Sequence, residues 1–168
     1  MIKHIVNIQI KRGLGFPFKK SELKRVIETA LKIAKMHEPV EVDCVITDNP
    51  TIHRLNKLYR GIDSPTDVLS FGLSDKQPAA DSVAFPVDPG AASFLGEIII
   101  SYQRTVEQAP AHGNTVEQEL NLLLVHGTLH LLGHDHEENT DARKMRAWEK
   151  KILKCLRLGD TGNNEPTL

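Results

Sequence analysis

Residues 120–136 read Leu-Asn-Leu-Leu-Leu-Val-His-Gly-Thr-Leu-His-Leu-Leu-Gly-His-Asp-His. The first half of this stretch is almost wholly apolar, yet four of the chain's eight histidines fall between positions 126 and 136. An imidazole fills an apolar segment poorly, because a buried polar ring needs partners. The spacing of the histidines indicates what those partners are.

His126 and His130 are four residues apart, so on a helix both side chains point off the same face. Two neutral imidazoles placed in this way can chelate one divalent ion. Gly133 fits the left-handed position that ends a helix, and His136 can return from the far side as a third ligand. The stretch therefore predicts a three-histidine metal site at the end of a buried helix.

The full pattern, H-x3-H-x2-G-x2-H, has the ligand spacing of the metzincin peptidases, H-E-x-x-H-x-x-G-x-x-H. Those enzymes carry a general-base Glu directly after the first His, where this chain has Gly127. The pattern thus supports the metal site but not peptidase chemistry. Three His ligands leave the fourth zinc position open to water, as in catalytic sites, and zinc makes hydroxide available near neutral pH. The alternative is a set of surface or capping histidines without a metal.

Two residues between the second and third proposed ligands have open roles. His134 precedes His136 by two residues, so the two side chains can point in opposite directions. We interpret His134 as a residue that lines the pocket or supports a ligand from behind. Asp135 can orient a ligand imidazole through a hydrogen bond, or it can close the turn.

Composition limits the class of protein. The chain has 168 residues, of which 40% are hydrophobic and 26% charged, which is typical of one globular domain. We expect that domain to span residues 1–158 and the polar residues 159–168 to form a disordered tail. The net charge of −1 excludes a strongly basic protein, so any nucleic-acid contact must use a local patch.

The ends and cysteines of the chain favour a cytoplasmic protein. The N-terminus alternates in hydropathy and does not resemble a signal peptide, and no stretch approaches the length of a membrane span. Cys44 and Cys155 are far apart in the sequence, and Cys44 lies on the apolar phase of an expected strand. A reduced core thiol is therefore the expectation for Cys44.

Hydrophobic periodicity predicts the order β-α-β-α-β-β-α-α-α, an α+β domain with a small mixed four-stranded sheet and about five helices. Strands are expected over residues 1–11, 40–46, 67–71 and 95–101. Helices are expected to follow caps at Ser21, Asn49, Thr115 and either Asn139 or Thr140, with one more over residues 102–109. Residues 73–93 show no period and contain three prolines, so we expect a mobile loop near the site.

Three stretches together resemble the YbeY family of bacterial metal-dependent endoribonucleases. They are residues 59–71, containing Thr-Asp-Val-Leu-Ser-Phe, residues 95–101, Leu-Gly-Glu-Ile-Ile-Ile-Ser, and the histidine motif at 126–136. The resemblance runs from the first strand to the last helix and leaves out the tail and the loop at 73–93. It implies a cytoplasmic, single-strand-specific endoribonuclease of 16S rRNA 3′-end maturation and ribosome quality control. Its expected partners are rRNA, small-subunit ribosomal proteins and a ribosome-associated GTPase.

The resemblance also implies roles for individual residues. His126, His130 and His136 match the three ligands of one zinc ion, with His126 counted among the catalytic groups. Arg60 matches the basic residue implicated in substrate handling and activity. Position 134 is Tyr in many relatives, which argues against His134 as the third ligand. Position 97 is Glu here where Asp is common.

These residues lead to a mechanistic hypothesis of RNA phosphodiester hydrolysis. Arg60 would hold the phosphate through charge-assisted hydrogen bonds and stabilise developing charge, and Lys57 would add a substrate contact. With Gly127 in place of a Glu, the attacking group is either the water on zinc or the RNA 2′-OH. The alternative for Arg60 is a solvated cation that interacts with a helix C-terminus. Further basic residues could extend an RNA groove or serve solubility alone: Lys11, Arg12, Lys19, Lys20, Lys24 and Arg25.

Two other functions fit parts of the pattern. A metallopeptidase-like hydrolase has the ligand spacing in its favour and Gly127 against it. A non-catalytic ribosome assembly factor with a structural zinc requires His134 or Asp135 to close the fourth metal position, because structural sites usually have four protein ligands.

Overall fold

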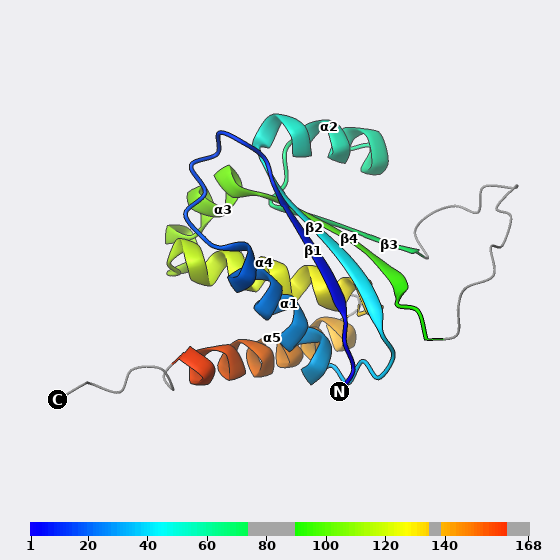
Figure 1. Ribbon diagram of the computed structural model, residues 1–168. Coiled ribbons are helices and arrows are strands. Elements are labelled where there is room, and N and C mark those ends of the chain that lie inside the picture. The colour runs from blue at the N-terminus through cyan, green and yellow to red at the C-terminus, as the bar shows by residue number, and fades with distance from the viewer. Residues whose placement is uncertain (74–89, 135–138, 161–168) are drawn as a thin grey trace, which may run out of the picture.

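A computed structural model describes residues 1–73, 90–134 and 139–160 (Figure 1). Four strands form one sheet in the order β1-β2-β4-β3, with bounds β1 (Ile5–Ile10), β2 (Val40–Thr47), β3 (Val68–Gly72) and β4 (Ser93–Ser101). β1, β2 and β4 run parallel, whereas β3 lies antiparallel at the edge beside β4. The predicted α+β class, element order and mixed sheet are confirmed.

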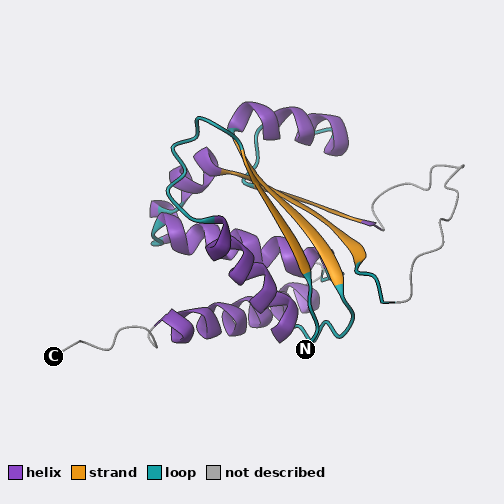
Figure 2. Ribbon diagram, viewed as in Figure 1, coloured by secondary structure: helices purple, strands orange, loops and turns teal. Residues whose placement is uncertain are grey.

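Helices cover both faces of this sheet (Figures 1 and 2). α2 (Asn49–Arg60) lies on one face, and α1 (Lys20–Ile33) and α4 (Val116–Leu131) lie on the other. α5 (Asn139–Asp160) packs against α4 and α1 as an outer layer. α3 (Tyr102–Gln108) and a short 3-10 turn, η2 (Pro110–His112), lead from β4 to α4. No described helix has the length and apolar character needed to cross a membrane.

The alternation of β2 sorts its side chains between the two faces. Val42, Cys44 and Ile46 are fully buried in the larger core with α1 and α4, while Val45 packs into the smaller cluster beneath α2. Burial, together with the nearby negative charges of Glu97 and Asp43, raises the pKa of the Cys44 thiol to about 12. Cys44 is therefore the buried core thiol that the sequence predicts, and Cys155 is exposed.

α4 packs very close to β4 because glycines stand at both sides of the contact. A Cβ added to Gly127 would lie 2.8 Å from Ile98 Cγ2, and one added to Gly96 would lie 2.6 Å from Leu131 Cδ2. Side-chain atoms at these positions would push the helix off the sheet. The contact fixes the rotation of α4: Gly127 faces the sheet, so its neighbour His126 lies to one side of this contact.

Two predicted caps are wrong by one or two positions. α1 begins before Ser21, and the Glu22 carboxylate accepts a hydrogen bond of 2.8 Å from the Lys19 backbone N–H at its start. α2 begins at Asn49 itself, so Asp48 is the N-cap and its Oδ1 accepts from the Thr51 N–H at 3.0 Å. In both helices a carboxylate satisfies an N–H group that has no partner within the helix.

Two expectations fall partly outside the described residues. Of the predicted loop at 73–93, residues 74–89 lie outside, and β4 already begins at Ser93. Of the predicted tail at 159–168, residues 161–168 lie outside, while α5 continues to Asp160. The expected boundary at residue 158 therefore falls within α5.

Candidate metal and phosphate site

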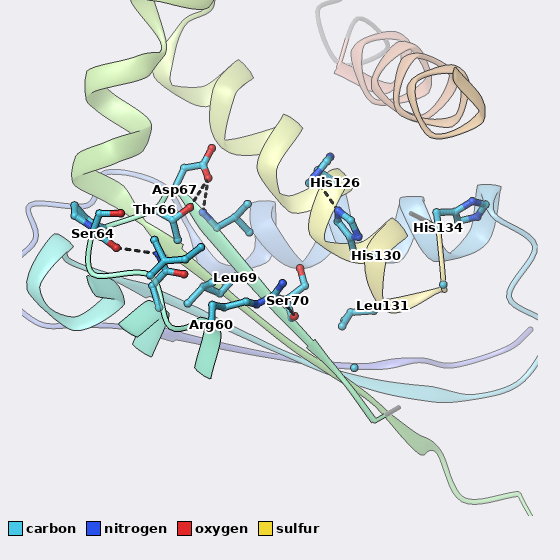
Figure 3. A pocket seen from close by; sticks show the side chains of 16 residues that line it. Arg60, Ser64, Thr66, Asp67, Leu69, Ser70, His126, His130, Leu131 and His134 are labelled. Carbon is cyan, nitrogen blue, oxygen red and sulfur yellow. Dashed lines mark hydrogen bonds between the residues drawn. The ribbon is translucent and has the colours of Figure 1, made fainter. Parts of the chain in front are cut away.

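A cavity of about 770 Å³ opens between the C-terminal half of α4 and the α2–β3 segment (Figure 3). Side chains from both sides line it, among them Arg60, Asp67, Ser70, His126 and His130. The cavity therefore joins the histidine motif to the Thr-Asp-Val-Leu-Ser stretch, which lies about 60 residues earlier in the chain.

α4 begins and ends as the sequence predicts. The Thr115 hydroxyl accepts from the Gln118 N–H at 3.2 Å, and the Gln118 side chain accepts from the Thr115 N–H at 2.9 Å, which makes a capping box. At the other end Gly133 has a φ of 88°, a left-handed conformation that favours glycine. The apolar run between these ends is buried, and this anchors the helix that carries the two histidines.

His126 and His130 point into the cavity from successive turns of α4 (Figure 3). Their Nε2 atoms lie 3.0 Å apart, and their ring planes meet at 75°. Two nitrogen ligands of a tetrahedral zinc ion lie about 3.3 Å apart, given Zn–N bonds of about 2.0–2.1 Å. The two imidazoles thus already converge as a pair of metal ligands does.

Glu149 of α5 fixes the orientation of His126. Its Oε1 lies 2.6 Å from His126 Nδ1, and the Glu149 side chain is only 13% exposed. A carboxylate in this position accepts the Nδ1–H, so the lone pair of the ring is on Nε2 and faces His130. A carboxylate behind an imidazole is the usual support of a metal-bound histidine.

The remaining residues of the histidine motif are only partly described. His136 and Asp135 lie outside the described residues, so their predicted roles stay predictions. His134 lines the cavity, but it lies apart from the His126–His130 pair and its ring is 6.1 Å from that of Trp148 (Figure 3). Within the described ranges no group of three or more potential metal ligands comes together.

Arg60 reaches the cavity from the end of α2. Its Nη2 donates to the Ser70 carbonyl of β3 at 3.0 Å, and its guanidinium lies 5.8 Å from the centre of the Phe71 ring. Ser70 also lies near α4, with its hydroxyl 3.5 Å from the Gly127 carbonyl. The exposed guanidinium is therefore placed on the opposite wall of the same cavity as the histidines (Figure 3).

Lys57 does not line the cavity. Its Nζ lies 2.8 Å from Asp63 Oδ2, and His53 contacts the other oxygen of the same carboxylate at 2.7 Å. The hydrogen bond from Lys57, followed by that from His53, lowers the pKa of Asp63 below its ordinary value. The structure does not bring Lys57 into the cavity with Arg60, and its predicted contact with the substrate stays a prediction.

A hydrogen-bond network holds the Thr-Asp segment against α4. Gln108 Nε2 donates to Asp67 Oδ2 at 3.0 Å and to Glu119 Oε1 at 2.8 Å. Glu119 is 1% exposed and also accepts from Asn114 and lies 2.8 Å from His112 Nδ1. The amide of Gln108 therefore ties the start of β3 to the first turn of α4, which sets the distance between the two walls of the cavity.

Sequence reasoning missed Glu149, Ser70 and the Gln108 network. The signal for Glu149 was present: it falls on the apolar stripe of α5, between Met145 and Ile152, where a charged residue needs a partner. The roles of Ser70 and Gln108 depend on long-range packing, and no local pattern reveals them.

Comparison with known proteins agrees with this geometry. The family model described as Endoribonuclease YbeY matches residues 7–157. Endoribonuclease YbeY of Roseiflexus sp. (strain RS-1) is 43% identical over 154 residues, covering 91% of this chain and 93% of that relative. The protein of the same name from Moorella thermoacetica is 43% identical over 133 residues, covering 79% of this chain and 83% of its own length.

Among solved structures, the chain is similar to the solution structure of TM1509 from Thermotoga maritima. The TM-score is 0.56 at 27% sequence identity, and the match covers 98% of this chain and 99% of that one. The chain belongs to the endoribonuclease YbeY family.

Proposed function

We propose that this protein is a metal-dependent endoribonuclease that hydrolyses phosphodiester bonds in single-stranded RNA. Within that activity we propose a role in 16S rRNA 3′-end maturation and ribosome quality control in the cytoplasm, with small-subunit ribosomal proteins and a GTPase as partners. Family membership supports this assignment. The single observation that carries the chemistry is the arrangement of His126 between His130 and Glu149.

The described residues fit a metal ion with imidazole ligands. His126 and His130 would hold it through Nε2, with His136 as the proposed third ligand. The Glu149 carboxylate makes His126 more basic and keeps its proton on Nδ1. A bound zinc ion would supply a Lewis acid and a nucleophile at neutral pH.

Arg60 is the proposed phosphate-binding group of the same cavity. One N–H of its guanidinium is held by the Ser70 carbonyl, and the group carries five N–H donors in all. The remaining donors can bind a phosphate in a planar, charge-assisted manner. Arg60 would thereby stabilise the charge that develops on the phosphoryl oxygens.

The position of Gly127 weighs against a peptidase. In the metzincin pattern a catalytic Glu occupies this position, but here the residue faces Ile98 of β4 and not the cavity. A Glu at this position would collide with the sheet. The geometry therefore favours chemistry that needs no carboxylate base from α4.

Metal analysis combined with RNA cleavage tests the proposal. The purified wild type should contain about one zinc ion per chain and cleave unstructured single-stranded RNA, with activity lost on chelation and restored by zinc. His130→Ala should lose the metal and the cleavage together. His37→Ala makes the same change at an exposed histidine far from His130 in the sequence. It serves as the matched control and should keep both the metal and the cleavage. Full activity in metal-free protein would disprove the proposal.

A further inference from the structure

α5 carries a basic stripe on its outer surface. Five exposed cations follow one another at spacings of three, four, four and three residues, which places them on one helix face: Arg143, Arg146, Lys150, Lys154 and Arg157. At a rise of 1.5 Å per residue the stripe is about 21 Å long. Within the described residues no carboxylate pairs with any of these five cations.

The stripe is out of keeping with the charge of the whole chain. The protein has a net charge of −1, yet α5 contains seven basic residues against Asp141, Glu149 and Asp160. Carboxylates gather on the other side of the sheet instead, where Asn7 bridges Glu41 and Asp43. This separation of charge would attract a polyanion to α5 and repel it from the opposite face.

The stripe also begins at the candidate site. Arg146 lines a second cavity, of about 550 Å³, together with His126 and Glu149. That cavity and the larger one share His126 and Asp67. A strand that passes Arg60 and the histidines can therefore continue through this second cavity onto α5 without leaving the surface.

We propose that the basic stripe of α5 binds the phosphate backbone of single-stranded RNA on the side of the histidines opposite Arg60. The inference rests on the proposed function for the identity of the polyanion. Arg60 and Arg146 then hold the strand on the two sides of the reacting bond, and Lys150, Lys154 and Arg157 extend the contact along the strand.

An anionic membrane is a poorer partner for this helix. Membrane-surface helices bury an apolar face among the lipids. In α5 that face is already used, since Met145, Ile152 and Leu156 are buried in the protein core. The helix presents positive charge to solvent, which suits the binding of a flexible polyanion.

A pair of charge reversals on the same helix tests the inference. Lys150→Glu/Lys154→Glu changes the stripe, whereas Lys144→Glu/Lys151→Glu changes the net charge equally on a different face of α5. Lys144 contacts Asp141, and Lys151 lies over the Trp148 ring. The probe is a labelled 2′-O-methyl oligouridine of about 20 nucleotides, which covers several phosphate contacts. Its affinity is measured across a range of salt concentrations with full-length, zinc-loaded protein.

The stripe variant should bind the probe at least about tenfold more weakly than the wild type, and its log–log salt slope should be shallower by about 1.4, or 0.7 for each lost phosphate contact. The matched variant should stay within about twofold of the wild type. Equal weakening of both variants, or of neither, would overturn the inference. So would stripe-dependent binding of phosphatidylserine vesicles with unchanged RNA affinity.

The same preparations separate this inference from the proposed function. If RNA binding depends on the stripe but the wild type cleaves no RNA, the inference about α5 is supported and the proposed nuclease function is overturned. If cleavage depends on zinc but RNA binding does not depend on the stripe, the nuclease function is supported and the inference about α5 is overturned. Circular dichroism and urea titration of both double variants confirm that each is folded.

Discussion

The two walls of the cavity are built in different ways. On the α4–α5 side, His126 and His130 project from a helix whose apolar residues are buried, and Glu149 fixes one ring from behind. On the α2–β3 side, Arg60 is exposed and is held by one carbonyl and one aromatic ring. The first wall holds its nitrogen atoms through a buried helix and a supporting carboxylate, and the second presents an exposed cation on a long side chain.

This difference matches the demands of the two proposed tasks, metal binding and phosphate binding. Metal ligands must converge on one point at fixed bond lengths, so their support has to be rigid. A phosphate is large and its negative charge is spread over several oxygens, so an exposed guanidinium with several N–H donors can bind it with less exact placement. Damage to one wall should therefore leave the proposed task of the other intact.

Removing the cation should have the largest effect. We expect Arg60→Ala to lower kcat for RNA cleavage by about 10²–10³-fold, because a donor to the developing charge is lost, while zinc content stays at the wild-type level. Arg60→Lys should recover only part of the rate, since an ammonium is a single point of charge. Arg54→Ala, an exposed arginine on the same helix that does not line the cavity, is the control. Loss of zinc from Arg60→Ala would break the distinction between the walls.

Removing the carboxylate behind His126 should have the next largest effect, on the metal. Glu149→Gln should weaken zinc binding by about 10–100-fold in chelator competition, because the ring loses its charged acceptor. Glu117→Gln makes the same chemical change on an exposed face of α4 and should bind zinc like the wild type. In the Arg60→Ala background, Glu149→Gln should weaken zinc binding by the same factor as in the wild type, because the two changes are independent. Unchanged zinc affinity in Glu149→Gln would remove the proposed role of this residue.

The close packing of α4 on β4 should be visible in stability. Gly127→Ala places a methyl group 2.8 Å from Ile98 Cγ2, and we expect it to cost about 1–2 kcal/mol after the better helix propensity of Ala is included. In an Ile98→Ala background the same change should cost less or become favourable. Urea titrations of the four proteins give this double-mutant cycle. An equal cost in both backgrounds would show that the contact does not set the position of the helix.

The smallest effect concerns the start of α2, the helix that carries Arg60. The hydrogen bond from Lys11, followed by that from Thr51, lowers the pKa of Asp48 to about 2. A carboxylate whose pKa is depressed in the folded state stabilises the protein above its ordinary pKa, and this contribution is lost as the pH falls from about 4 to about 2. Asp48→Asn should therefore cost about 1 kcal/mol at pH 7, because solvent screens the pair.

The pH dependence of the difference supplies the test. The stability of Asp48→Asn and of the wild type should converge as the pH falls towards 2, and Lys11→Met should flatten the wild-type dependence in the same way. A difference that stays constant from pH 7 to pH 2.5 would show that the charge of Asp48 does not contribute.

The sequence predicted those parts of the structure that local pattern controls. The Thr115–Gln118 capping box and the helix stop at Gly133 are short-range signals, and both are observed. The Asn49 cap was misplaced because Asp48 and Asn49 are both good caps, and tertiary contacts distinguish them. Asp48 pairs with Lys11, whereas Asn49 Oδ1 accepts a hydrogen bond from the Ser101 hydroxyl.

The candidate site was predictable only in part. The i,i+4 spacing of His126 and His130 is enough to bring them together, because a helix fixes that geometry by itself. Arg60 entered the site through family resemblance, and nothing in its local sequence marks it. Glu149 lies 23 residues from its partner, and its role depends on how α5 crosses α4. Contacts of this kind arise from packing and not from periodicity.

The hydrogen bond from Arg60 of α2 to β3 has a further consequence. β3 is the edge strand beside the cavity, and an open strand edge is a template for pairing with another chain, which leads to aggregation. By donating to the Ser70 carbonyl, Arg60 occupies a group of that edge and places a positive charge beside it. Replacing Arg60 would leave the Ser70 carbonyl of this edge without that donor, so the activity of Arg60 variants should be measured on monodisperse material.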